Sequence, residues 1–312
     1  MITALANIGR TGLVVGGCNA VGFGITALLE THKITDLVGA GSFVVATTAL
    51  SIKNNLHQYP LQNLKLSLIN VGVMIWGIRL ASFLFQRVLQ VGEDKRLNKF
   101  FRQPGESYLD AERSLFPIKL AGFWTIQSMW GFLCLLPVSI LNSVPLTTSS
   151  GIPNPLLSFI GKSPFHTAIS VLPVLGIYTG ILIETLADTQ KNQYRNDQQN
   201  DGHWCDKGLW KYSRHPNYFG ELLTWWSIYC ASLPAIYTHS PTLPAKVAMS
   251  LIALISPVFI TYLLLKLSGI PLLEKKYKKQ YQGNSEYEEY IWNTPLLMPN
   301  PFLAFYSKNK MK

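Results

Sequence analysis

The chain has 312 residues, of which 48% are hydrophobic and only 14% are charged, and its formal net charge at pH 7 is +10. Ordinary soluble domains carry roughly 25% charged residues, so this composition excludes a disordered chain and argues against a soluble one. The 27 Lys and Arg residues gather in a few blocks beside long apolar runs instead of spreading over one exposed face. We therefore expect an integral membrane protein and no nucleic-acid partner.

Seven apolar segments are long enough to cross a bilayer core of about 30 Å, which needs about 20 helical residues. They cover residues 11–29, 34–52, 65–86, 116–141, 165–187, 217–239 and 246–268. The fold class that follows is all-α: a polytopic membrane helix bundle of about seven transmembrane helices with cytosolic loops and a cytosolic C-terminal segment. In the first segment, Gly12 and Gly16 form a small-xxx-small pair, which favours close approach of another helix.

The basic residues divide unequally between the two sides of such a bundle. With seven spans, 20 Lys and Arg residues fall on the side of the C-terminus and 5 on the other. Because positive residues favour the cytoplasm, we expect the C-terminus to be cytosolic. The last five residues, Lys308–Lys312, read K-x-K-x-x, which resembles a dilysine retrieval signal and predicts the endoplasmic reticulum membrane in a eukaryotic host. The alternative is a basic tail that contacts the membrane surface.

Two parts are expected along the chain, N-terminal spans over 1–60 and a membrane domain over 61–312, together forming one structural unit. No metal site is predicted, because His203, Cys205 and His215 match no common zinc spacing and lack a fourth ligand. The sequence does not predict an oligomeric state.

The most informative stretch runs from Gly208 to Glu221 and reads GLWKYSRHPNYFGE. Pro216 suits the first turn of a helix, where its missing N–H costs nothing. This helix would begin at the membrane surface with Arg214 and His215 beside its positive dipole end, which favours binding of an anion such as phosphate. The alternative is an interfacial belt of basic and aromatic anchors.

Polar residues continue from this entrance into the apolar segment. Asn217, Glu221 and Trp225 recur at i, i+4 and i+8 and therefore share a helix face. An ionisable side chain at mid-membrane costs roughly 2.5–3.5 kcal/mol, so we expect Glu221 to face a polar cavity with a partner.

A second polar stripe lies at the end of the fifth apolar segment. Its members, spaced by 4, 3 and 4 residues, are Glu184, Asp188, Lys191 and Arg195. Such spacing brings them to one helix face, either as part of a binding site or as a ladder of weak ion pairs.

The string Ser-Arg-His-Pro-Asn-Tyr-Phe-Gly-Glu at 213–221, followed by Trp225 and Trp226, resembles the C-terminal domain of the steroid 5-alpha-reductase-like family of integral membrane oxidoreductases, in a poorly characterised branch. The likeness extends to further segments, namely 184–195, 269–277, 287–290, 76–80 and Gln127.

This resemblance implies binding of NADPH from the cytosolic side and reduction of a carbon–carbon double bond in a hydrophobic substrate of steroid, polyprenol or fatty-acyl type. It implies that Asn217, Tyr218 and Glu221 hold the nicotinamide end. It also implies that Asp188, Arg195 and Arg214 contact the ribose and phosphate end.

The remaining cofactor-binding residues that we expect are Glu184, Lys191, His215 and Trp225. The reaction also needs a group that polarises the substrate carbonyl, and Tyr218 is the predicted catalytic residue, with Tyr178 and Glu184 as alternatives. The acid and tyrosine that recognise the carbonyl in the steroid enzymes have no match here.

Two other functions remain open. Isoprenylcysteine carboxyl methyltransferases share an Arg-His-Pro-x-Tyr-x-Gly element, which predicts S-adenosylmethionine as the cofactor of a lipid or protein methyltransferase. A non-enzymatic sterol-binding or scaffold protein would keep the fold without turnover.

Overall fold

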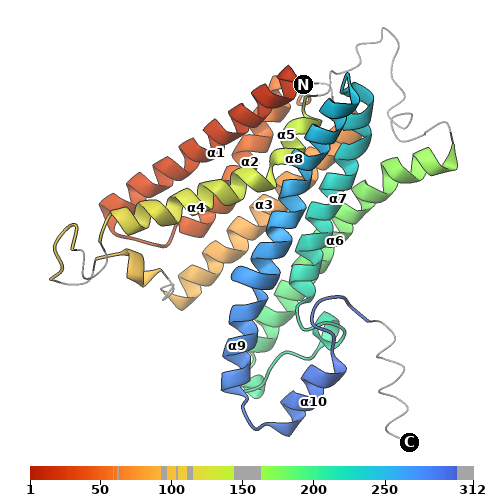
Figure 1. The fold of residues 1–312 in the computed structure, drawn as a ribbon. Coiled ribbons are helices and arrows are strands. Elements are labelled where there is room, and N and C mark those ends of the chain that lie inside the picture. The colour runs from red at the N-terminus through yellow and green to blue at the C-terminus, as the bar shows by residue number, and fades with distance from the viewer. Residues whose placement is uncertain are drawn as a thin grey trace, which may run out of the picture. The chain divides into compact units, whose positions relative to one another are not determined.

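The computed structural model describes residues 1–58, 60–61, 63–92, 97–102, 105–110, 115–143 and 163–300. In this part of the chain the regular elements are all helices, without a strand, as Figure 1 shows. The predicted all-α fold class is therefore confirmed. The C-terminal K-x-K-x-x motif lies outside the described residues.

The helices follow the predicted apolar segments closely. They are α1 (Ile2–Leu29), α2 (Thr35–Lys53), α3 (Leu64–Val91), α4 (Ile118–Cys134), α5 (Leu136–Leu141), α6 (Pro164–Asn196), α7 (Pro216–His239), α8 (Leu243–Tyr262), α9 (Ile270–Gln280) and α10 (Ser285–Asn293). A π-helical segment, Leu263–Leu267, joins α8 to α9, and short 3-10 turns lie at Asn98–Phe100, Gln198–Asn200 and Gly208–Lys211.

Among the described residues, five helical stretches are long and apolar enough to cross a membrane, namely α1, α2, α3, α6 and the stretch Leu243–Gln280 that contains α8 and α9. This number makes the chain a multi-pass membrane protein. Helices also occupy the other two predicted ranges, but α4 has only 17 residues and α7 carries many Trp, Tyr, Ser and Thr side chains. Seven crossings therefore stay a prediction.

The distribution of side chains on α1 fits a lipid surrounding. Leu13 and Leu28 on its outer side are 78% and 86% exposed. Its buried residues include Asn7 and Thr11, at 0% and 1% exposure. Apolar side chains thus face outward and polar ones inward, where protein groups satisfy their hydrogen bonds.

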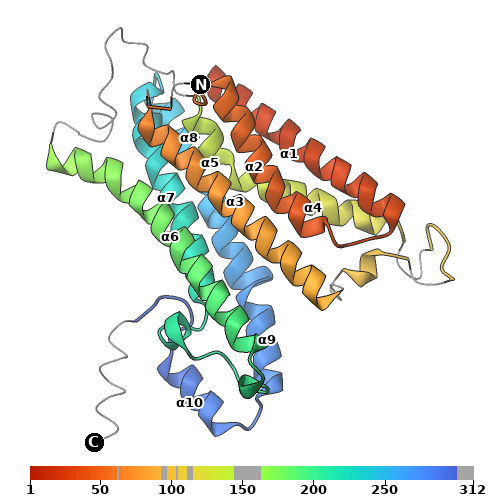
Figure 2. The same cartoon turned by 180° about the vertical axis from the view of Figure 1, so that it is seen from behind.

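The chain divides into two compact units, Met1–Val171 with Ile228–Ser256, and Leu172–Ser227 with Pro257–Lys312. In the first unit, α1 packs against α2 and α4, and α2 packs against α3; Figure 2 shows α1, α2 and α3 side by side. The predicted boundary at residue 60, between N-terminal spans and a membrane domain, stays a prediction.

The close approach predicted at Gly12 and Gly16 is wrong for Gly16, because no neighbouring atom lies within 4 Å of the place where its Cβ would stand. Gly12 faces only the Phe132 ring, at 3.3 Å. One small-xxx-small pair therefore does not bring two backbones together here, because the face that carries it is only partly covered.

A close helix crossing lies in the second unit, between α6 and α7. A Cβ on Gly220 would stand 2.6 Å from the carbonyl oxygen of Gly180 and 2.7 Å from the backbone nitrogen of Glu184. A Cβ on Gly176 would collide with the Ser227 hydroxyl. Glycine at these positions lets the two backbones touch, which brings the polar ends of α6 and α7 next to each other.

Candidate functional site

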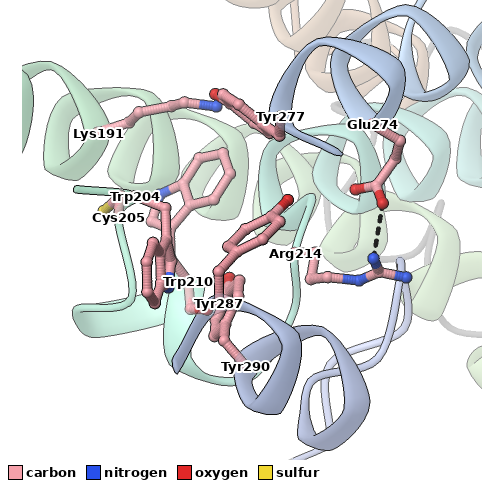
Figure 3. A pocket seen from close by; sticks show the side chains of 9 residues that line it. All are labelled: Lys191, Trp204, Cys205, Trp210, Arg214, Glu274, Tyr277, Tyr287 and Tyr290. Carbon is pink, nitrogen blue, oxygen red and sulfur yellow. Dashed lines mark hydrogen bonds and ion pairs between the residues drawn. The ribbon is translucent and has the colours of Figure 1, made fainter. Parts of the chain in front are cut away.

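A small pocket, partly open to solvent, lies in the second unit. Five aromatic rings form most of its wall, together with two basic side chains, a carboxylate and a thiol (Figure 3). The wall consists of Lys191, Trp204, Cys205, Trp210, Arg214, Glu274, Tyr277, Tyr287 and Tyr290.

The two C-terminal tyrosines of the wall are presented by α10. The side chain of Asn284 caps this helix by accepting the N–H of Tyr287 at 3.0 Å, as Asn commonly does at this position. Tyr287 and Tyr290 are three residues apart and so face the same way. The Tyr290 hydroxyl donates to the carbonyl oxygen of Trp210 at 2.9 Å, which ties α10 to the segment before α7.

Aromatic faces and a cation meet in the pocket. The ammonium of Lys191, on α6, lies 4.1 Å from the centre of the Trp210 ring and 5.5 Å from that of Tyr277. The Trp204 ring packs edge-on against Tyr287, with centroids 5.0 Å apart. The wall therefore offers π faces under a positive charge.

Glu274, on α9, links the pocket to the start of α7. Its carboxylate accepts one hydrogen bond from Arg214 Nη1 at 2.6 Å and another from His215 Nε2 at 2.8 Å. Pro216 begins α7, as predicted. Ser213 Oγ accepts the N–H of His215 at 3.1 Å and donates to the carbonyl oxygen of Leu297 at 2.7 Å, so the residues after α10 hold this turn.

His215 is neutral in this setting. It is 1% exposed, and burial lowers its pKa from 6.5, against the opposing effect of its hydrogen bond to Glu274. Since a carboxylate only accepts, Nε2 carries the proton and Nδ1 is the acceptor nitrogen. The His215 ring stacks on Tyr218, with centroids 5.6 Å apart and an interplanar angle of 15°.

The tyrosines of α10 also stay neutral at physiological pH. Burial, with a further contribution from the nearby Glu274 carboxylate, raises the pKa of Tyr287 to about 12. Burial raises the pKa of Tyr290 as well, and that of the Cys205 thiol. The wall thus presents neutral O–H and S–H groups beside the charges of Lys191 and Arg214.

Three carboxylates are buried where α6 and α7 cross. Glu184, Asp188 and Glu221 are 3%, 8% and 9% exposed. Asn217 Nδ2 donates to Asp188 Oδ1 at 3.1 Å, and Trp225 is fully buried. Glu221 therefore lies inside the protein and not among lipid chains. This placement agrees with the free-energy cost of exposing an ionisable side chain to the membrane interior.

A sequence model of one protein family, described as "Protein of unknown function (DUF1295)", matches residues 22–294. The chain belongs to the DUF1295 family. Comparisons with curated proteins and with solved structures find no match. The match includes all residues of the pocket wall and of the α6–α7 crossing.

The pocket of this DUF1295 chain contains two of the residues predicted from its sequence, Lys191 and Arg214. Arg195 lies in the last turn of α6 and is exposed. The other predicted residues lie outside the wall and are Glu184, Asp188, His215, Asn217, Tyr218, Glu221 and Trp225. Of these, His215 joins the wall through Glu274, and Asn217 joins the buried acids through Asp188. Their roles as ligands, and that of Tyr218 in catalysis, stay predictions.

Sequence reasoning missed seven wall residues, which are Trp204, Cys205, Trp210, Glu274, Tyr277, Tyr287 and Tyr290. Part of the signal was present, because segments 269–277 and 287–290 belong to the resemblance described above. The spacing of Tyr287 and Tyr290 also indicates one helix face.

Four buried polar atoms of this region make no hydrogen bond to any described residue, namely Trp204 Nε1, Arg214 Nε, His215 Nδ1 and Asn217 Oδ1. Buried polar groups in native proteins nearly always have partners, so each such atom calls for an explanation. The first two are N–H donors in the pocket wall, and the last two are acceptors near the start of α7. Among the described residues, no group of three or more His, Cys, Asp and Glu side chains is arranged to hold a metal ion.

Proposed function

We propose that this chain is a membrane oxidoreductase that uses NADPH to reduce a carbon–carbon double bond in a hydrophobic, lipid-like substrate. The observation that carries the proposal is the group of four buried polar atoms without a protein partner around the pocket and the start of α7. The sequence at 213–221 supports it, because it resembles the steroid 5-alpha-reductase-like enzymes. The proposal includes membership of the steroid 5-alpha-reductase-like family.

The side chains of the pocket wall carry chemical groups that suit a nucleotide cofactor. Flat aromatic faces stack on bases, and Trp204 Nε1 and Arg214 Nε are N–H donors that suit phosphate oxygens. Lys191 adds positive charge. Asn217 Oδ1 is an acceptor that suits the N–H groups of a carboxamide. When bound, NADPH supplies a hydride.

The chain's own groups would orient the reactants and exclude water. The Glu274 carboxylate fixes Arg214 and His215, and stacking on His215 fixes the ring of Tyr218. In the proposal, the Tyr218 hydroxyl donates a hydrogen bond to the substrate oxygen on which negative charge develops. The pocket would open to the cytosol, with the enzyme in the endoplasmic reticulum of a eukaryotic host, and the substrate would enter from the lipid.

Calorimetric titration of the detergent-purified full chain with NADPH tests the cofactor. Trp204→Phe keeps the ring and removes the indole N–H, so we expect about tenfold to hundredfold weaker binding, the equivalent of roughly 1.5–3 kcal/mol for a hydrogen bond to a charged group. Arg214→Lys keeps the charge and removes Nε–H, with a similar expected loss. The control is Trp226→Phe, since Trp226 Nε1 donates to Thr261 and lies outside the pocket wall.

Several outcomes would contradict the proposal. Binding of S-adenosylmethionine in place of NADPH would indicate the methyltransferase. Binding of NADPH without its oxidation in the presence of lipid enones would indicate the non-enzymatic protein. Equal NADPH affinity in Trp204→Phe and Trp226→Phe would contradict the proposal that NADPH binds in this pocket.

A further inference from the structure

Helix α9 has two chemically different faces. One face carries Ile270, Glu274 and Tyr277, spaced by 4 and 3 residues, and Glu274 and Tyr277 belong to the pocket wall. Ile270 is 3% exposed. This face of α9 therefore packs inside the second unit.

The opposite face is basic and open to the surroundings. It carries Leu272, Lys275, Lys276 and Lys279, which follow one another at helical spacings of three and four residues. Leu272 is 57% exposed, and the three lysines are exposed as well. None of these ammonium groups makes an ion pair or hydrogen bond with a described residue of the chain. We call these four residues the lysine face.

The lysine face follows a long uncharged apolar run along the chain. Residues 247–265 contain no charged side chain, and α9 follows after the π-helical segment, as Figure 1 shows. Leu267, between the two helices, is 61% exposed. Clustered lysines that follow an apolar membrane segment are attracted to an anionic membrane surface, and their alkyl stems can lie along apolar surface.

The charge pattern favours an anionic neighbour. Lys275 and Lys279 are four residues apart, and Lys276 and Lys279 are three apart, so these like charges repel one another along the helix. Anionic headgroups would relieve that repulsion, and an exposed leucine among the lysines suits a lipid surface better than an aqueous one.

We propose that the lysine face of α9 binds the anionic phospholipid headgroups of the bilayer. Bound headgroups order α9 and, through it, the part of the pocket wall formed by Glu274 and Tyr277. This inference is independent of the cofactor and of the reaction.

Lysine-directed acylation, resolved by mass spectrometry, tests the proposal on the full chain in nanodiscs. One sample contains phosphatidylcholine alone and the other contains phosphatidylcholine with phosphatidylserine. We expect acylation at Lys275, Lys276 and Lys279 to slow several-fold with phosphatidylserine, and this protection to disappear at about 1 M salt, where the Debye length is about 3 Å. The internal controls are Lys207 and Lys211, which are exposed on another segment of the second unit.

A pair of charge-matched variants gives a second measurement. Lys275→Gln with Lys279→Gln removes two charges from the lysine face, and Lys207→Gln with Lys211→Gln removes two elsewhere. In native mass spectrometry, we expect the first variant to bind phosphatidylserine about thirtyfold more weakly, since each lysine contributes about 1 kcal/mol near an anionic surface. The second variant should bind it as the wild type does.

Hydrogen exchange then reports on order in α9. We expect slower exchange of its backbone amides in nanodiscs with phosphatidylserine than without. Equal acylation rates in the two wild-type samples would overturn the proposal, and so would equal protection of the lysine face and of Lys207 and Lys211. The wild-type comparison decides the matter even if the variants do not fold.

Discussion

Gly220→Ala adds one methyl group at the point where α6 and α7 touch. The new Cβ would lie 2.6 Å from the carbonyl oxygen of Gly180 and 2.7 Å from the backbone nitrogen of Glu184. Ordinary contact begins at 3.4 Å, so the helices must separate by about 0.8 Å. Both neighbouring atoms belong to backbone, which cannot turn aside as a side chain does.

The cost follows from these contacts. Overpacking of this kind costs about 1–3 kcal/mol. The same shift stretches the hydrogen bond from Asn217 to Asp188, 3.1 Å long, which contributes about 0.5–1.5 kcal/mol. Alanine recovers about 1 kcal/mol of helix propensity. A net loss of about 0.5–3.5 kcal/mol remains, which lowers the thermal midpoint by roughly 1–14 °C.

Thermal unfolding of the detergent-purified protein, followed by circular dichroism, measures this loss. The matched control is Gly24→Ala in α1, where nothing lies within 4 Å of the added Cβ. There the propensity gain of about 0.5–1 kcal/mol is unopposed, so the midpoint should rise. If Gly220→Ala proved as stable as Gly24→Ala, the close crossing of α6 and α7 would be refuted.

Three further predictions concern the pocket. Burial lowers the pKa of His215 in the folded protein, so as pH falls the imidazole is protonated in the unfolded chain before it is protonated in the folded one. The free energy of unfolding should therefore decrease as pH drops below about 6.5. Thermal midpoints measured from neutral to acidic pH should show this decrease in the wild type and not in His215→Asn. Since the pKa of Tyr287 is raised to about 12, the folded state should lose stability as pH rises from about 10 toward that value. Because Tyr287 is still protonated at pH 11, ultraviolet titration should then show about the same number of tyrosinates in the folded wild type as in folded Tyr287→Phe. Glu274→Gln removes the charge that holds the part-buried Arg214 and should cost about 1–3 kcal/mol, against no change for the exposed Asp201→Asn; equal thermal midpoints would contradict it.

The sequence predicted the positions of the helices well because the bilayer dictates both their length and their apolar composition. The start of α7 at Pro216 was predictable from proline's preference for a first helical turn. The range 116–141 was expected to be one helix and is instead two, α4 and α5. The break lies at Leu135, before Pro137, because proline fits the first turn of a new helix and disrupts a continuing one.

The close helix crossing was not predictable from glycine spacing. The pairs Gly12–Gly16 and Gly176–Gly180 have the same i, i+4 spacing, but only the second meets a backbone or a small side chain of another helix. The pattern describes one surface and does not say which helix covers it.

The pocket was predicted only in part because its wall joins segments far apart in sequence. Helices α9 and α10 have 11 and 9 residues, and such short helices depend on packing more than on their own propensity. The hydrogen bond from Tyr290 to the Trp210 carbonyl spans 80 residues. Local patterns give the faces of these helices but not their partners.

Glu274 shows why the parts of the site act together. Its carboxylate holds Arg214, which lines the pocket, and His215, which stacks on Tyr218. A displacement of α9 would therefore reorient the Arg214 guanidinium in the pocket wall. It would also shift the His215 ring on which Tyr218, the predicted catalytic residue, stacks. Since the lysine face lies on the other side of this helix, a lipid that orders α9 would fix both. The geometry of the site then depends on the membrane surface through one three-turn helix.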